Sequence, residues 1–255
     1  MSGLAVTDPS MLGLALLVAV LAGVVKGVVG FAMPMIILSG LGSFLSPELA
    51  LAGLILPTLV TNVAQSLKGG LAAALSTFRD FWRLNLILVA TILVVAQTVT
   101  ALPKELFYAL MGIPVLSYAL IELSGRKLVF PVRYRRLSEI AAALIAGFFG
   151  GVSGSWGPAV VAYFLSLDMP KAELVRAQGV CYLLGSFFLA VAHLNSGILN
   201  AATIPFSALL ILPGLAGLWV GFRLHDRIDI VVFRRVMLIV LAVAGLNLIR
   251  RAFLG

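Results

Sequence analysis

The chain has 255 residues, of which 62% are hydrophobic and only 11% are charged, and its mean hydropathy is +1.14. A soluble domain is nearer half apolar and a quarter charged, so this composition excludes a water-soluble protein and predicts one embedded in lipid. The net charge is +8, but the positive residues lie in short segments between apolar runs, which indicates cytoplasmic loops and argues against a nucleic-acid partner.

Six apolar segments each supply the roughly 20 residues that a helix needs to cross a hydrocarbon core. In chain order they are 49–67, 83–101, 105–123, 174–193, 201–221 and 232–249. Two longer stretches, 11–45 and 137–167, are interrupted by glycine. Inside lipid only helices and closed barrels satisfy their own backbone, and these runs lack the alternation of barrel strands. We therefore expect an all-α polytopic membrane protein.

The two interrupted stretches resemble each other. The first contains AGVVKGVVGFAMP, from Ala22 to Pro34, and the second contains AGFFGGVSGSWGP, from Ala146 to Pro158. Their glycines and their prolines match at a constant offset, and the same order of apolar segments follows each of them. This pattern predicts an internal repeat with halves of 1–127 and 128–255, which together form one transmembrane domain.

The charges of the loops predict how the halves are oriented. The basic loops are 68–83, 124–136 and 223–235, and the nearly neutral ones are 102–105 and 194–200. If the basic loops are cytoplasmic, each interrupted stretch must enter and leave the membrane on one face. Each half then has three transmembrane helices and one broken, re-entrant helix, and the two repeats are inverted. This topology leaves Arg250 and Arg251 outside, whereas an alternative with eight spans places 223–235 outside.

Each glycine-proline segment predicts a helix break followed by a new helix start, at Gly30–Pro34 and at Gly154–Pro158. Glycine permits conformations that other residues resist, and proline is favoured in the first turn of a helix. A helix start leaves free N–H groups and a partial positive charge, which suit an anion. Two such starts facing each other would form one pocket. The alternative is that the glycines mediate helix contacts and the prolines kink helices.

Two cations are candidates for the anion path. Lys26 lies within the first interrupted segment, where a charge is costly unless it meets water or a partner. It would hold the anion or release a proton during a cycle, or else extend to the membrane interface. Arg176 follows Glu173 by three positions, which favours pairing between them, with the anion path as the alternative role for Arg176.

Uncharged polar side chains supply the further donors that a small oxyanion needs. Asn62 and Gln65 share a helix face, and Ser153, Ser155 and Trp156 flank the second break. The complete predicted substrate-binding set is Lys26, Gly27, Gly30, Phe31, Pro34, Asn62, Gln65, Gly151, Ser153, Gly154, Ser155, Trp156, Pro158, Arg176 and Gln178. The alternative role for the polar members is hydrogen bonding between helices.

Motifs of soluble catalysis are missing from the sequence, which contains no P-loop, HExxH or GxSxG pattern, so we expect neither an enzyme nor a cofactor or metal site. Cys181, the single cysteine, is expected to be a small buried residue. His193 ends an apolar run and is expected at the membrane interface rather than in a proton relay. The first residues lack the basic start of a cleaved signal peptide, so the first apolar run is expected in the mature protein.

In the two segments AGVVKGVVGFAMP and AGFFGGVSGSWGP, and in its basic central loop, the chain resembles the TauE/SafE family of sulfite exporters over nearly its whole length. The resemblance implies a small sulfur-containing anion as substrate. The matching positions are Gly27, Gly30, Pro34, Gly151, Gly154 and Pro158. The chain departs from the family's glycine-rich pattern at Phe31 and Ala32 and at Ser155 and Trp156, and the bulky Phe31 and Trp156 would reshape the pocket.

The sequence thus predicts a secondary transporter of sulfite, a sulfonate or a similar anion in a bacterial-type inner membrane. The substrate would bind at the paired helix starts near the midplane and cross by alternating access, with a proton or sodium ion as the coupling partner. The second hypothesis is a passive small-anion channel, in which the same helix dipoles act as a filter. A third is an intramembrane enzyme or scaffold without flux. Pairing into a homodimer is left open.

Overall fold

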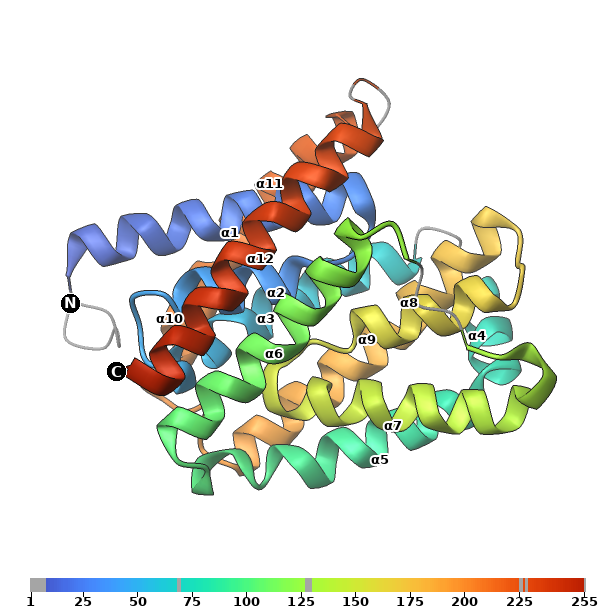
Figure 1. Ribbon diagram of the computed structural model, residues 1–255, viewed down its shortest axis with the longest axis horizontal. Coiled ribbons are helices and arrows are strands. Elements are labelled where there is room, and N and C mark those ends of the chain that lie inside the picture. The colour runs from blue at the N-terminus through green and yellow to red at the C-terminus, as the bar shows by residue number, and fades with distance from the viewer. Residues whose placement is uncertain (1–7, 68–69, 127–129, 225–226, 228, 255) are drawn as a thin grey trace.

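The computed structural model describes residues 8–67, 70–126, 130–224, 227 and 229–254, and within these ranges it is helical without strands (Figure 1). The α-helices are α1 (Pro9–Val29), α2 (Met33–Leu41), α3 (Pro47–Ser66), α4 (Leu71–Asp80), α5 (Trp82–Ala96), α6 (Lys104–Leu123), α7 (Arg135–Ser153), α8 (Gly157–Ser166), α9 (Lys171–Asn195), α10 (Ile204–Leu209), α11 (Ile211–Leu224) and α12 (Ile230–Leu254). Short 3₁₀ turns cover Val99–Ala101 and Val132–Tyr134. Parts of the three predicted basic loops, at 68–69, 127–129, 225–226 and 228, lie outside the described residues.

Among the described residues, eight helical segments are long and apolar enough to cross a membrane, which confirms a polytopic α-helical membrane protein. Six of them match the apolar segments expected from the sequence. The other two are α1 and α7, with 21 and 19 residues, which are the first arms of the interrupted stretches. Only the second arms are short, since α2 has 9 residues and α8 has 10. Each interrupted stretch is therefore one helix of spanning length followed by a half-length helix.

Both predicted helix breaks are present. Gly30, with φ of 86°, ends α1, and α2 begins three residues later with Pro34 in its first turn. Gly154, with φ of 68°, ends α7, and α8 begins at Gly157 with Pro158 in its first turn. Ala32 also adopts a left-handed conformation, with φ of 74°, although it is not glycine. The sequence chemistry of these segments thus produces two chain reversals rather than two kinked helices.

Close glycine contacts join the two halves of the chain. A Cβ at Gly23 would lie 2.2 Å from the carbonyl oxygen of Gly214, and a Cβ at Gly27 would lie 2.5 Å from that of Leu218. From the first contact to the second, the residue number increases in both helices, so α1 and α11 run in the same direction. The same holds for α5 and α7, where Gly147 meets Leu88 and Thr91 and Gly151 meets Ile92 and Val95. The first helix of each half thus packs along the third long helix of the other half.

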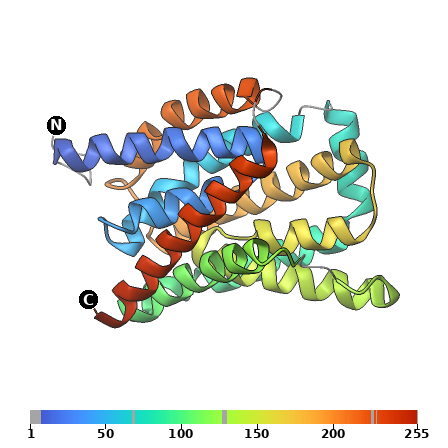
Figure 2. The same cartoon turned by 45° about the horizontal axis from the view of Figure 1, so that its top comes forward.

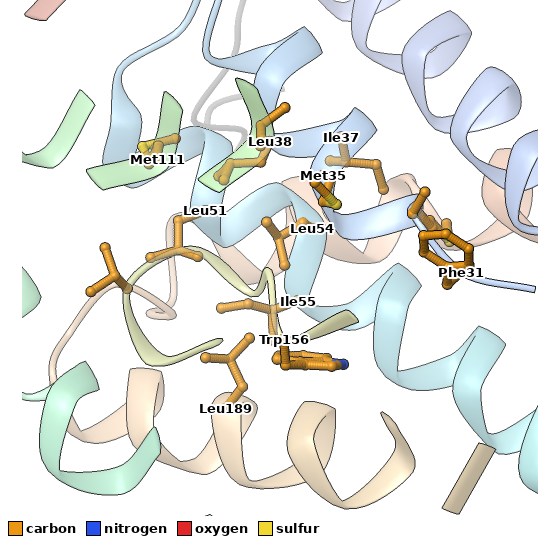
Figure 3. Packing of buried hydrophobic residues seen from close by; sticks show 14 of the residues in the cluster. Phe31, Met35, Ile37, Leu38, Leu51, Leu54, Ile55, Met111, Trp156 and Leu189 are labelled. Carbon is orange, nitrogen blue, oxygen red and sulfur yellow. The ribbon is translucent and has the colours of Figure 1, made fainter. Parts of the chain in front are cut away.

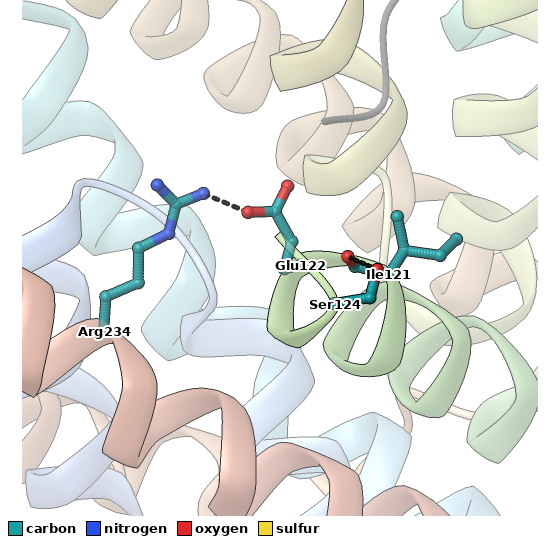
Figure 4. Close-up of polar contacts among 4 residues, drawn as sticks. All are labelled: Ile121, Glu122, Ser124 and Arg234. Atoms are coloured by element: carbon teal, nitrogen blue, oxygen red, sulfur yellow. Dashed lines mark hydrogen bonds and ion pairs between the residues drawn. The ribbon is translucent and has the colours of Figure 1, made fainter. Parts of the chain in front are cut away.

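The last long helices of the two halves, α6 and α12, cross in opposite directions, and Gly112 and Gly245 allow their close contact (Figures 1 and 2). An ion pair between Arg234 and Glu122 links them near one end (Figure 4). Near the other end, Arg251 stacks on the ring of Tyr108, 4.6 Å from its centroid, and donates hydrogen bonds to the carbonyls of the α2–α3 connection. These contacts fix the far end of the first short helix.

The centre of the molecule is formed by α3 and α9, with the short helices α2 and α8 beside them. In the apolar part of α3, 67% of the residues are buried, whereas in that of α12 only 28% are buried, which leaves a broad apolar surface on α12 for lipid. Figure 3 shows the buried apolar side chains that pack around the two breaks, including Phe31 and Trp156. The breaks therefore lie inside the protein, where irregular backbone is tolerated.

Candidate functional site

The two helix breaks meet at one cavity. The cavity is small, about 20 Å³, and both breaks contribute to its lining. A Cβ at Gly157, the first residue of α8, would lie 3.6 Å from the ring of Phe31, and a Cβ at Gly154 would lie 3.6 Å from Pro34. The lining residues are Lys26, Phe31, Ala32, Pro34, Met35, Asn62, Gly154, Ser155, Trp156, Gly157 and Tyr182. Residues from distant parts of the chain are thus brought together at the point predicted from the repeat.

Two helix starts border this cavity. Neither α2 nor α8 receives a hydrogen bond from an N-cap side chain, because Ala32 has no polar group and Trp156 makes no capping contact. The N–H groups of a first helical turn have no partner within their own helix, and they carry the positive end of the helix dipole. Both short helices therefore present donors and partial positive charge to a ligand in the cavity.

Lys26 places its amino group in the same cavity. Its side chain is only 2% exposed, so it does not extend to the membrane interface, the alternative considered from the sequence. The ammonium donates to Thr61 Oγ1 at 2.9 Å and to Asn62 Oδ1. Both partners are neutral, and no carboxylate pairs with Lys26 among the described residues. An ammonium has three N–H donors, so these contacts leave one for a ligand.

Asn62 and Gln65 hold the surroundings of Lys26 in place. The amide nitrogen of Asn62 donates to the Tyr182 carbonyl at 2.9 Å and to Ser186 Oγ at 3.1 Å, which ties α3 to α9. This orientation leaves the amide oxygen of Asn62 to accept from Lys26. Gln65 donates to the carbonyl of Gly30 at 3.1 Å and so fixes the end of α1. Both residues thus position the first break, and Asn62 also lines the cavity.

Tyr182 lines the cavity and was not among the predicted residues. Its hydroxyl is buried and has no hydrogen-bond partner among the described side chains and backbone groups. A tyrosine in an apolar run has the pattern of an ordinary core residue. The signal that could have found it is the spacing of Gln178, Tyr182 and Ser186, which places three polar groups on one face of α9.

Comparison with known proteins assigns the family. A family model described as sulfite exporter TauE/SafE matches residues 15–248, which includes both breaks and every residue that lines the cavity. The chain belongs to the TauE/SafE family. No curated protein and no solved structure matches it. Membership of an exporter family, together with the eight apolar helices, makes the chain a multi-pass membrane transport protein.

Several predicted residues of this TauE/SafE protein lie outside the cavity lining. Gly27 and Gly151 face neighbouring helices, where a Cβ would meet Gly221 and Val95 respectively, so they serve helix packing. Ser153 is buried and donates to the Phe149 carbonyl of its own helix at 2.8 Å. The remaining predicted residues outside the lining are Gly30, Gln65, Pro158, Arg176 and Gln178. Gly30, Gln65 and Pro158 shape the breaks without lining the space between them.

The expected pairing of Arg176 was wrong. Arg176 does not pair with Glu173 within the described residues; its Nε donates to Thr77 Oγ1 of α4 at 2.8 Å instead. The neighbouring Gln178 is buried on α9. His193 is fully buried in the last turn of α9, and its Nδ1 lies 3.0 Å from Ser196 Oγ. Arg176 thus joins α9 to α4 and does not contribute to the cavity of this family member.

Proposed function

We propose that the protein is a secondary transporter that carries a small organosulfur anion, such as sulfite or a short sulfonate, across the inner membrane. The observation that carries this proposal is Lys26, a buried cation that lines the cavity and has only neutral partners. A charge held away from water is costly unless an opposite charge compensates it. An anion in the cavity supplies that opposite charge, so binding of an anion lowers the free energy of the buried Lys26 side chain.

The other groups around the cavity match an oxyanion rather than a cation. The Tyr182 hydroxyl, the remaining N–H of Lys26 and the first-turn N–H groups of α2 and α8 are all donors. Carboxylates, which a cation site needs, do not line the described cavity. The oxygens of sulfite or of a sulfonate head accept several hydrogen bonds at once, so donors from both halves of the chain can share one anion.

The packing of the halves supports inverted repeats and alternating access, which we include in the proposal. Each half places its first helix along the third long helix of the other, and each contributes one half-length helix to the cavity. Repeats of opposite orientation with a site at their interface are a recurring transporter plan. Relative movement of the halves 1–127 and 128–255 around the bound anion would expose it to one face and then the other.

Binding and flux assays test the transport proposal. Sulfite should raise the melting temperature of the purified protein, because a ligand that binds only the folded state stabilises it. Proteoliposomes with an imposed proton or sodium gradient should accumulate sulfite above its external concentration. Flux that only dissipates a sulfite gradient would favour the channel alternative, and neither binding nor flux would contradict the proposal.

Cysteine labelling tests the inverted orientation. In a Cys181→Ala background, Ser124→Cys and Ala201→Cys introduce thiols at exposed positions in the α6–α7 and α9–α10 connections. We expect a membrane-impermeant maleimide to label Ser124→Cys only from the cytoplasmic face and Ala201→Cys only from the opposite face, because the basic connection stays inside. Labelling of both positions from one face would contradict the inverted topology.

Tyr182→Phe tests the part played by the unpartnered hydroxyl. Because the substitution removes only one oxygen, the fold should be retained, while loss of a hydrogen bond to a charged ligand should weaken sulfite binding about tenfold or more. Calorimetry on the two proteins measures the ratio of dissociation constants. Tyr163→Phe, which alters a buried tyrosine outside the cavity lining, is the matched control and should bind as the natural protein does.

A further inference from the structure

The two halves of the chain differ in side chains at the cavity although their backbones correspond. Gly30 and Gly154 end α1 and α7, and the same offset relates the starts of α2 and α8 and the starts of α3 and α9. At this offset Lys26 corresponds to Gly150, and Thr61, which accepts a hydrogen bond from Lys26, corresponds to Gly185. The second half thus has two glycines where the first half has an ammonium and its partner.

Trp156 occupies the space beside these two glycines. A Cβ at Gly150 would lie 3.0 Å from Cε3 of the indole, and a Cβ at Gly185 would lie 3.5 Å from its Cδ2 and Cε2. The residue that corresponds to Trp156 in the first half is Ala32. The tryptophan is only 2% exposed and also lines the cavity. Figure 3 shows its ring among the buried apolar side chains. The glycines and the indole therefore form a matched set, because a side chain at Gly150 would collide with the ring.

We propose that Trp156 determines specificity by filling the compartment of the second half that mirrors the Lys26 compartment. This inference rests on the proposed function and narrows its substrate to anions whose organic part is absent or very small. Among the described neighbours of Gly150 and Gly185 there is no cation, and the apolar side chains of Leu88 and Ile92 lie 3.4 to 3.5 Å from the glycine Cβ positions. If the indole were removed, the compartment would accept the apolar substituent of a larger sulfonate while its anionic head stayed at Lys26.

The chain offers a matched comparison for this role. Trp156→Ala and Trp156→Phe replace the indole with a methyl group and with a smaller aromatic ring. The Phe variant keeps enough side-chain volume to fold if the Ala variant does not. Trp219→Ala is the control, since Trp219 is 55% exposed on α11 and stacks with Arg223 away from the cavity. Dissociation constants of sulfite and of benzenesulfonate, measured by calorimetry on each purified protein, give a selectivity ratio.

We expect the natural protein to bind sulfite and to exclude benzenesulfonate. In Trp156→Ala the selectivity ratio should shift toward benzenesulfonate by about tenfold or more, because pocket shape alone discriminates ligands by such factors. Trp156→Phe should shift the ratio in the same direction by less, and Trp219→Ala should leave it unchanged.

Two results would overturn the inference while leaving the proposed function in place. One is tight binding of both anions by the natural protein, and the other is an unchanged selectivity ratio in Trp156→Ala and Trp156→Phe with sulfite binding intact. If the natural protein binds neither anion, the proposed function fails and this inference fails with it.

Discussion

Lys26→Met is expected to remove sulfite binding while the protein still folds. Methionine keeps most of the length of lysine but has neither charge nor donor, so the cavity loses the group that compensates an anion. Removing one partner of a buried charge pair costs about 3–5 kcal/mol, which weakens binding on the order of 100-fold or more. Sulfite should therefore no longer raise the melting temperature of the variant.

The melting temperature of Lys26→Met without ligand separates this result from general damage. The substitution removes a buried charge that has only neutral partners, so stability without ligand should not collapse. Arg176→Gln is the control, because this cation contacts Thr77 and does not line the cavity. It should bind sulfite normally. Natural affinity in Lys26→Met, or equal losses in the two variants, would contradict the assigned site.

Gly217→Val is expected to prevent folding. A Cβ at Gly217 would lie 2.1 Å from the carbonyl oxygen of Val20 and 2.9 Å from the backbone nitrogen of Val24. These are backbone atoms of α1, so the clash can be relieved only by moving α11 away from α1. Steric clashes of this kind can lower the free energy of unfolding by more than about 4 kcal/mol. A loss of that size approaches the total free energy of unfolding of many proteins.

The yield of monodisperse protein in size-exclusion chromatography measures this effect. Gly13→Val is the matched control, because it places the same side chain on α1 at a position with no atom within 4 Å of the Cβ. It should be recovered like the natural protein. Recovery of folded Gly217→Val with an unchanged melting temperature would show that α1 and α11 do not depend on this contact.

The spans and the breaks could be predicted from the sequence because their causes are local. Length and hydropathy determine whether a segment can cross a membrane, and the Gly30–Pro34 and Gly154–Pro158 segments combine a helix terminator with a helix initiator. The first arms were harder to assign, because hydropathy alone does not show whether a segment before a break crosses completely.

The side-chain contacts of the site could not be predicted as fully. These helices are apolar on most faces, so periodicity does not show which face points inward. Gly27 and Gly30 look alike in sequence, yet one packs against α11 and the other ends α1. A pair three apart on a helix gains only about 0.2–0.5 kcal/mol. The contact of Arg176 with Thr77 of another helix therefore replaces the expected pair with Glu173.

Anomalous diffraction from crystals soaked in selenite, the heavier analogue of sulfite, tests the central claim most directly. The proposed site predicts one selenium peak between the two helix breaks, with selenite oxygens about 2.7–2.9 Å from Lys26 Nζ, as in charge-assisted hydrogen bonds. The Tyr182 hydroxyl should contact the same anion. A saturating soak that places selenite elsewhere, or leaves the Lys26 cavity without a peak, would contradict the claim that this cavity is the anion site.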